Sequence, residues 1–190
     1  MNTNFAQVHS YQNVEWKLFD KDGNIKRIFQ ENKLFTWLMK KEILSPLFLK
    51  IPFLLGKWSD KKVVKNLVTN AGFALNAGLL CGSGTPAAVT YIALGTGTTA
   101  AAVTDTVLQT EITTGGLARS AATVSLVTTT VTNDTAQLLN TFTATASFAV
   151  TESGIFNAAT GGTLFAHQVF SAINLVNGDN IQTTWKIQEH

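Results

Sequence analysis

The chain has 190 residues with 14 Lys and Arg, 12 Asp and Glu and 3 His, which gives a formal net charge of +2. This small charge excludes the strongly basic surface typical of nucleic-acid-binding domains. Apolar residues make up 45% of the chain, enough to bury one core of ordinary size. Cys81 is the only cysteine, so an intrachain disulfide and a cysteine-based metal site are also excluded.

The charges are distributed unevenly along the chain, with a break near residue 65. Residues 1–65 hold twelve basic and six acidic residues, so their formal charge is 12 − 6 = +6. Residues 66–190 hold two basic and six acidic residues, 2 − 6 = −4, and 25 of these 125 residues are Thr. Such asymmetry predicts an arm that meets a partner and a body that packs. We therefore expect an N-terminal hairpin segment over 1–32, a basic, apolar docking arm over 33–65 and a β-sandwich body over 66–190.

The first candidate element is a β-hairpin. The runs Val14–Phe19 and Ile25–Phe29 flank an Asp-Gly turn at 20–24, and Gly tolerates the positive φ that such a turn needs. The same stretch resembles a calcium-binding loop in its first, third, fifth and twelfth positions. Its sixth position is Ile25, however, where a calcium loop requires Gly. A hairpin turn is therefore the better interpretation.

The docking arm follows. The spacing of apolar residues in 33–43 predicts a short amphipathic helix. Pro46 and Pro52 then impose an extended path that leaves apolar side chains uncovered, as is usual for a docking surface. Aromatic and aliphatic anchors dominate interfaces, so these residues are the predicted partner-docking site: Phe35, Trp37, Leu38, Leu47, Phe48, Ile51, Phe53, Leu54 and Trp58.

Lysines flank this apolar strip at 40–41 and 61–62. Such charges suit an acidic protein or a membrane surface, or they serve only to keep the strip soluble. The most apolar window, Leu44–Leu55, is twelve residues long and broken by Lys50 and two prolines, which is too short to span a bilayer. Proline-broken segments also make poor interfacial helices, so we expect a protein partner and neither membrane nor nucleic acid. The start of the chain lacks the pattern of a secretory signal.

The body begins with a helix over Asn66–Leu80, with Thr69 or Asn70 as its N-cap and Gly82 at its end. The elements expected after it are a strand over Val89–Leu94, a short helix over Thr104–Ile112, and strands over Ala118–Val131, Asn140–Ala149, Glu152–Asn157, Leu164–Ile173 and Asn180–Gln188. Thr-rich strands separated by Gly, Asn and Asp turns are typical of a β-sandwich. The expected fold class is mainly β, with a β-sandwich body, short helices, an N-terminal hairpin and a docking arm.

Motifs that carry chemistry are weak in this chain. Gly95–Ala100 fits the dinucleotide pattern G-x-G-x-x-[GA], but the chain then continues as strands rather than as a βαβ unit. A Ser–His–acid site would have to use His167, and no G-x-S-x-G elbow is present to supply its nucleophile. We expect Arg119 to form a structural ion pair with Glu111 or Glu152. No catalytic residue, metal site or cofactor is predicted.

Several segments of the body form a recognisable series. They are Asn66-Leu-Val-Thr-Asn-Ala-Gly72, Tyr91-Ile-Ala-Leu-Gly-Thr-Gly97, Asp105-Thr-Val-Leu-Gln-Thr-Glu111, Gly116-Leu-Ala-Arg119, Thr151-Glu-Ser-Gly-Ile-Phe-Asn157, Gly162-Thr-Leu-Phe-Ala166 and Asn177-Gly-Asp-Asn-Ile-Gln-Thr-Thr-Trp185. This series resembles a family of small β-structured proteins associated with the head or tail of tailed bacteriophages. The resemblance covers about two-thirds of the chain. Relative to the family pattern, residues 33–62 are inserted after the hairpin, and we expect this addition to set the docking site.

The resemblance implies a non-enzymatic structural component of a tailed-phage virion, assembled in the cytoplasm of the host bacterium. It would attach to the head or tail through its N-terminal arm, as a capsid decoration, head fibre or tail accessory. Its partners would be other virion proteins and further copies of itself, as a homotrimer by analogy. An alternative is a receptor- or glycan-binding adhesin that uses Tyr91, Trp185 or loop Asn residues, and a third hypothesis is a hydrolase. The sequence leaves open the position in the virion, the copy number and the identity of the partner.

Overall fold

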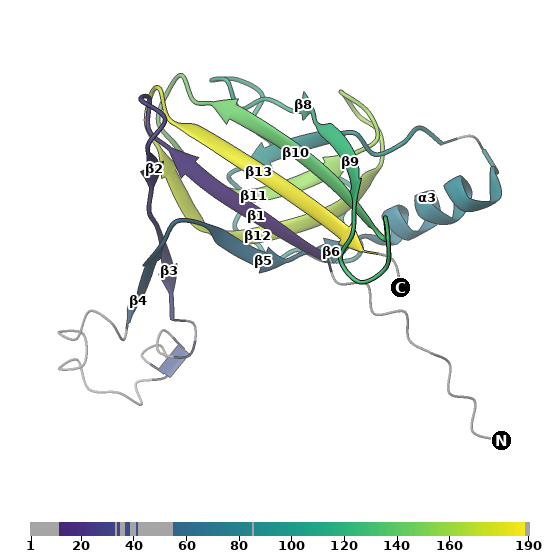
Figure 1. Cartoon of the computed structure of the whole chain (residues 1–190), viewed down its shortest axis with the longest axis horizontal. Coiled ribbons are helices and arrows are strands. Elements are labelled where there is room, and N and C mark those ends of the chain that lie inside the picture. Colours follow the sequence, from purple (N-terminus) through teal and green to yellow (C-terminus); the bar gives the residue numbers. More distant parts are fainter. Residues whose placement is uncertain are drawn as a thin grey trace.

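The computed structural model describes residues 12–32, 34, 37, 38, 41, 55–84 and 86–188. Two antiparallel sheets face each other as a sandwich, and a two-stranded ribbon leaves it at one end while a helix projects at the other (Figure 1). The expected mainly-β class with a β-sandwich body is confirmed.

The larger sheet has the order β2-β1-β13-β10-β9, and β5 also pairs with β1. Its strands are β1 Gln12–Phe19, β2 Ile25–Lys26, β5 Lys62–Lys65, β9 Thr123–Val127, β10 Thr135–Thr143 and β13 Asn180–Gln188. β1 pairs with β13 along its whole length, from Gln12 opposite Ile187 to Phe19 opposite Asn180. Two strands that precede residue 66, β1 and β5, thus lie within the sheet that β13 helps to form.

The smaller sheet has the order β6-β12-β11-β7-β8. Its strands are β6 Leu67–Val68, β7 Tyr91–Gly95, β8 Ser120–Ala121, β11 Phe148–Phe156 and β12 Leu164–Leu175. The separate ribbon pairs β3 Ile28–Glu31 with β4 Gly56–Ser59, and the projecting helix is α3 Asn70–Cys81. All strand pairs are antiparallel, as expected when short turns connect successive strands.

The core lies between the two sheets. Alternate residues of β1, namely Val14, Trp16 and Leu18, are buried, because successive side chains of a strand point to opposite faces. The Trp16 ring lies 4.0 Å from the Phe170 ring of β12, so the two sheets interlock at this point. Trp185 on β13 is fully buried as well. Each such side chain contributes about 1.5–3 kcal/mol or more through its burial.

Helix α3 matches its prediction at both ends. Thr69 is the N-cap: its Oγ1 accepts a hydrogen bond from Gly72 N at 2.9 Å and donates one to Leu164 O at 2.6 Å. Gly82 closes the helix with φ +64°, and its N–H donates to Gly78 O. A Cβ at Gly72 would lie 2.1 Å from Phe165 O, so the helix can approach β12 only because Gly stands there.

The predicted turns are also present. Positive φ angles occur at Gly115, Gly116, Asn133, Gly161, Gly162 and Gly178, each within a sequence that predicts a turn. The strand expected over Asn140–Ala149 is wrong, because β10 ends at Thr143 and β11 starts at Phe148. The turn between them contains Ala, Thr and Ser but neither Gly nor Pro, so the sequence gives no turn signal there.

The helix expected over Thr104–Ile112 is wrong too. This stretch has no helix and lies along β7 instead, with Ile112 N donating to Leu94 O at 2.9 Å and Thr96 N to Thr110 O at 2.9 Å. The backbone N–H groups of Gln109 and Thr110 donate to a side chain elsewhere in the fold, described below. Long-range partners have therefore outweighed the local capping pattern. Within the described ranges, no helix combines the length and the hydropathy that crossing a bilayer requires.

Candidate docking surface and a buried charged network

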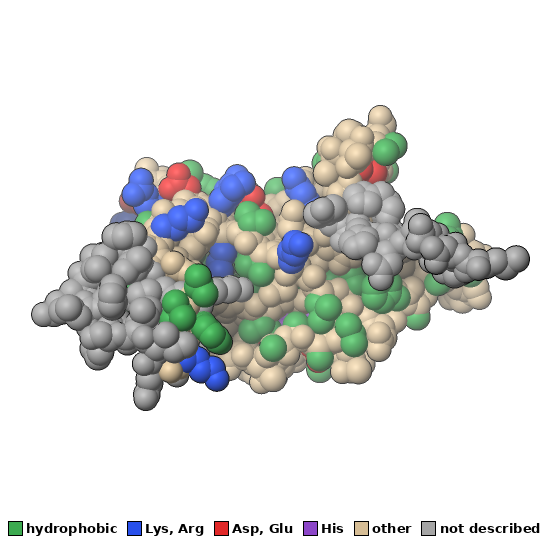
Figure 2. All heavy atoms as spheres, turned by 90° about the horizontal axis from the view of Figure 1, so that it is seen from below, with side chains coloured by type: hydrophobic (Ala, Val, Ile, Leu, Met, Phe, Trp, Pro, Cys, Tyr) green, Lys and Arg blue, Asp and Glu red, His purple; other side chains and the backbone are tan. Residues whose placement is uncertain are grey.

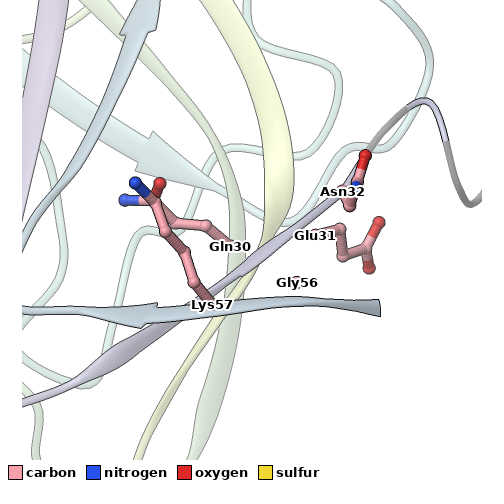
Figure 3. Close-up of a pocket in the computed structure, with 5 residues that line it drawn as sticks. All are labelled: Gln30, Glu31, Asn32, Gly56 and Lys57. Carbon is pink, nitrogen blue, oxygen red and sulfur yellow. The ribbon is translucent and has the colours of Figure 1, made fainter. Parts of the chain in front are cut away.

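Two described strands belong to the predicted docking arm: β4, which pairs with β3 in the ribbon, and β5, which pairs with β1 in the larger sheet. Gln30 lies opposite Lys57 in the register, and Figure 3 shows both side chains on the same side of the ribbon. A hollow of about 250 Å³ lies here, and its lining includes Glu31 and Asn32. A Cβ at Gly56 would lie 2.2 Å from Gln30 O, so only Gly permits the close approach of the two strands. The paired strands thus hold the two residues that flank the connecting stretch, Glu31 and Gly56, opposite each other.

Trp58 is the most exposed large side chain of this ribbon, at 63%. Its ring centroid lies 5.4 Å from that of Phe29 with an interplanar angle of 60°, a tilted arrangement that aromatic pairs favour. Ile28, next to Phe29, is buried and anchors the ribbon to the core. An exposed Trp held by a neighbouring ring is the kind of residue that dominates binding energy in protein interfaces.

The nine predicted docking residues fall into two groups. Trp37 and Trp58 are exposed and Leu38 is half-buried. The remaining six lie outside the described residues: Phe35, Leu47, Phe48, Ile51, Phe53 and Leu54. The docking set therefore stays a prediction. Phe29, which contacts Trp58, was missed because its place in the hairpin pattern marks it only as a strand residue.

Basic side chains gather at this end of the molecule. Figure 2 shows most of the visible Lys and Arg side chains on the half of this face that lies beside the ribbon. Lys61 pairs with Glu15 at 2.8 Å and Arg27 with Asp60 at 3.6 Å. Exposed pairs of this kind contribute about 0–1 kcal/mol each, so they tune the surface rather than hold the fold.

Lys62 differs from the other lysines near the arm. It is only 6% exposed, and its Nζ donates to Ser171 O at 2.7 Å and lies 5.4 Å from the Phe170 ring centroid. The expectation that both lysines at 61–62 are exposed flanking charges is therefore wrong for Lys62. It joins β5 to β12 beneath the ribbon.

The calcium-like stretch is a hairpin turn, as expected. Asp20 Oδ1 accepts from Asp22 N at 2.9 Å and from Asn24 N at 2.8 Å, and Gly23 has φ +84°. The hydrogen bonds from Asn24 lower the pKa of the Asp20 carboxyl. Among the described residues, no group of three or more His, Cys, Asp and Glu side chains is placed to hold a metal ion.

A charged network lies buried in the body. His167 on β12 is fully buried, and its Nδ1 lies 2.8 Å from Asp105 Oδ2 while its Nε2 lies 3.0 Å from Glu152 Oε2. Glu152 on β11 is fully buried as well. Asp105 also accepts from Ala102 N at 2.8 Å within the loop that follows β7. The network therefore joins β11, β12 and this loop.

The Glu152 carboxylate accepts four hydrogen bonds. Its Oε1 accepts from the backbone N–H groups of Gly97 at 2.8 Å and Thr110 at 2.7 Å. Its Oε2 accepts from Gln109 N at 3.0 Å and from His167. One buried side chain thus satisfies three amides of the loop, which is why this loop needs no helix of its own.

The protonation states follow from these contacts. Burial raises the pKa of Glu152, but the hydrogen bonds from His167 and from three backbone amides outweigh it and leave that pKa lowered. Burial lowers the pKa of His167, but the hydrogen bonds to Glu152 and Asp105 outweigh it and leave that pKa raised. Both ring nitrogens can donate only in the imidazolium form. The network is therefore a cation held between two carboxylates.

The buried network forms hydrogen bonds with the groups that a dinucleotide site and a Ser–His–acid site would each need. In the Gly95–Ala100 motif the Gly97 amide donates to Glu152, whereas a dinucleotide site would offer such an amide to a phosphate. Neither nitrogen of His167 is left to activate a serine. The nearby Ser153 Oγ donates to Ala93 O at 2.9 Å and accepts from Trp185 Nε1 at 3.2 Å. These groups are used in holding the fold.

Arg119 forms the second charged cluster. It pairs with Glu111, one of its two expected partners, through two hydrogen bonds of 2.9 and 2.6 Å. Its guanidinium lies 3.5 Å from the centroid of the Phe156 ring and donates to Gly161 O at 2.7 Å and Ala158 O at 3.2 Å. The expected ion pair is thus present, but it joins a loop to the β11–β12 turn rather than a helix to the sheet.

Sequence reasoning missed the partnership of Asp105, Glu152 and His167. The three lie far apart in the chain, and no spacing rule connects them. One usable signal exists: Glu152 and His167 are charged or titratable residues inside runs that otherwise predict buried strands, and buried charges require partners. Because the body has few charged residues, a charged or titratable residue in a predicted buried strand indicates that another such residue is its partner.

Comparison with known proteins places this body in a viral setting. A family model described as podophage GP4 fiber I protein gp80 matches residues 69–186. The match spans 186 − 69 + 1 = 118 of the 190 residues and includes both sheets' later strands and all three members of the buried network. No curated protein and no solved structure matches the chain.

Proposed function

Since the chain belongs to the family of podophage GP4 fiber I protein gp80, and is thus a structural component of a phage virion, we propose that it is non-enzymatic and attaches to the head or tail through its docking arm. The contact is made by the stretch that connects β3 to β4, together with Trp58. Its partners are other virion proteins and further copies of itself, as a homotrimer. It is assembled into the virion in the cytoplasm of the host bacterium.

The observation that supports this attachment best is Trp58. The side chain is 63% exposed although Phe29 and the ribbon hold it in a defined place. A folded chain gains nothing in water from an exposed Trp, whereas a partner that covers it gains a large apolar contact. Lys57, next to Trp58 in β4, and the other basic side chains at this end of the molecule favour a partner whose surface is acidic.

The non-enzymatic role has support from the body. Its buried histidine has both nitrogens bound to carboxylates, and its one arginine is bound to Glu111 and to backbone oxygens. Such saturated clusters stabilise a fold. The adhesin alternative is weakened at one residue, because Trp185 is fully buried and cannot contact a receptor. That expected contact was wrong.

The attachment is tested with the double variant Phe48→Asp, Phe53→Asp. We expect it to fold but to be absent from purified virions, because charged side chains cannot enter an apolar interface. Tryptophan fluorescence and the mass of the isolated protein check folding, and quantitative mass spectrometry of particles measures incorporation. Val131→Asp is the control, because Val131 is an apolar side chain that is 63% exposed and lies outside the arm. Normal incorporation of the double variant would contradict the proposed attachment.

A further inference from the structure

Helix α3 is predominantly apolar, with Asn70 and Asn76 as its only amide side chains. Its sequence, Asn-Ala-Gly-Phe-Ala-Leu-Asn-Ala-Gly-Leu-Leu-Cys, has no charged residue, and only Gly72 and Leu75 are buried against the sandwich. Phe73 is 58% exposed and Leu80 is 91% exposed. A helix of this composition normally lies inside a protein rather than at its edge. The exposed side of α3 is therefore a surface that another molecule covers.

The neighbouring loop extends this surface. Asn70 N donates to Val103 O at 2.7 Å, which brings the loop that follows β7 beside the start of the helix. Val103 and Val107 on this loop are exposed at 43% and 65%. The loop is held by the buried network of Glu152, so its valines are presented by a fixed backbone. We call Phe73, Ala74, Ala77, Leu80, Val103 and Val107 the α3 face.

The six side chains of the α3 face carry no charge. All five described carboxylates of the body accept internal hydrogen bonds, those of Asp105, Glu111, Asp134, Glu152 and Asp179. A partner recognised by charge would therefore find no charged side chain on the face itself to pair with. A second copy of the same face brings apolar surface without any charge that needs a partner. Small residues at 74 and 77 let such faces approach closely.

We propose that the α3 face is the surface through which copies of this chain associate. This inference rests on the self-association in the proposed function and assigns it to the end of the molecule opposite the ribbon (Figure 1). The docking arm is then free to bind a different virion protein. Because every copy contributes the same patch, the contacts repeat around a symmetry axis.

The test measures mass by light scattering for the full chain and its variants. We expect the wild type to be a defined oligomer and Phe73→Glu, Leu80→Glu to fall to the 20.4 kDa of a single chain. The control Ile25→Glu, Val176→Glu changes two other exposed apolar side chains, 52% and 53% exposed, that lie away from α3. This variant should remain oligomeric. Circular dichroism shows that each variant is folded.

Two further measurements separate this inference from the proposed attachment. An arm-excised variant, in which Asn-Gly replaces residues 33–54, should keep the same number of chains per oligomer even though it is not incorporated into virions. Cys81, the last residue of α3, is exposed in the single chain and is the only cysteine, so alkylation by a maleimide reports on the face directly. We expect slow labelling in the wild type and fast labelling in Phe73→Glu, Leu80→Glu.

Several outcomes would overturn the inference. A wild type that is monomeric at every concentration, or a folded α3 variant that stays oligomeric, contradicts it. Loss of the oligomer in the arm-excised variant alone assigns self-association to the arm. Dissociation by Leu126→Glu but not by the α3 variant assigns it to the edge strand β9 instead. A monomer whose Cys81 becomes reactive only after removal of residues 1–11 means that the chain covers its own face.

Discussion

The two ends of the sandwich expose apolar side chains in opposite electrostatic surroundings. The ribbon end has the exposed Trp58 and a concentration of basic side chains, of which Arg27 and Lys61 form exposed ion pairs. At the helix end, Leu80 and Phe73 have no charged neighbour on their own helix. Charges at the rim of an interface select a partner and steer its approach, whereas a neutral apolar face gains only from burial. The difference suggests that one end recognises a different protein and the other end a copy.

The largest expected effect tests whether the ribbon end is separable from the rest. Deleting residues 1–65 removes Val14, Trp16 and Leu18 from the core, and the loss of one buried Trp alone costs about 3–5 kcal/mol. We therefore expect the 66–190 fragment not to fold. The arm-excised variant should keep the fold, because Asn32 N donates to Leu55 O at 2.8 Å and a two-residue turn can close the ribbon there. Circular dichroism and thermal melts distinguish the two, and a stable 66–190 fragment would contradict the assigned role of β1.

The second-largest expected effect tests whether the buried network around Glu152 stabilises the helix end of the molecule. Glu152→Gln keeps the shape of the side chain but places an NH₂ group against donors, since both carboxylate oxygens accept hydrogen bonds. It also removes a charge from beside the His167 cation. We expect a loss of about 3–5 kcal/mol in the free energy of unfolding, measured in urea. Asp60→Asn at the ribbon end is the control and should cost less than about 1 kcal/mol. Equal losses of unfolding free energy in Glu152→Gln and Asp60→Asn would show that the buried network stabilises the fold no more than an exposed ion pair does.

The smallest effect is the pH dependence that the buried network contributes to stability. The pKa of His167 is raised from 6.5, so its contribution to stability is complete below pH 6.5 and is lost as pH rises through the folded-state value. The pKa of Glu152 is lowered from 4.5, so its contribution is complete above pH 4.5 and is lost as pH falls through the folded-state value. We expect the network to be strongest between these limits. Each unit by which the His167 pKa is raised corresponds to about 1.4 kcal/mol.

The measurement is urea unfolding of the wild type and of His167→Gln across pH 5 to 9. The wild type should lose stability toward the alkaline end, and the variant should lose much less because Gln does not titrate. Parallel curves for the two proteins would show that His167 is neutral in the folded state. Asp60→Asn should follow the wild type throughout.

Local features of the fold could be predicted from the sequence, and long-range ones could not. Thr69 and Gly82 mark the ends of α3 because capping depends on residues within one turn of the helix. β13 was predicted with its observed bounds, since alternation and the preceding Asn-Gly turn are local as well. The stretch 104–112 shows the limit: its pattern predicts a helix, but the carboxylate that binds its amides belongs to Glu152, about forty residues later.

The candidate site divides in the same way. Composition and proline placement predict an apolar basic arm, and the structure adds the Phe29–Trp58 pair that supports it. The α3 face could not be foreseen, because the sequence of the helix shows that it is apolar but not which side the sandwich leaves uncovered. Exposure depends on the packing of β12 against Gly72, which only the three-dimensional arrangement shows.

The pairing of β1 with β13 has a consequence for how the protein is made. Gln12 meets Ile187 across 187 − 12 = 175 residues of chain, so the larger sheet cannot close until the chain has been synthesised through β13. Contacts of such sequence separation form slowly and late. A chain that stops before Asn180 leaves Trp16 without the strand that covers one side of β1. The larger sheet can therefore take its final form only after β13 has been synthesised.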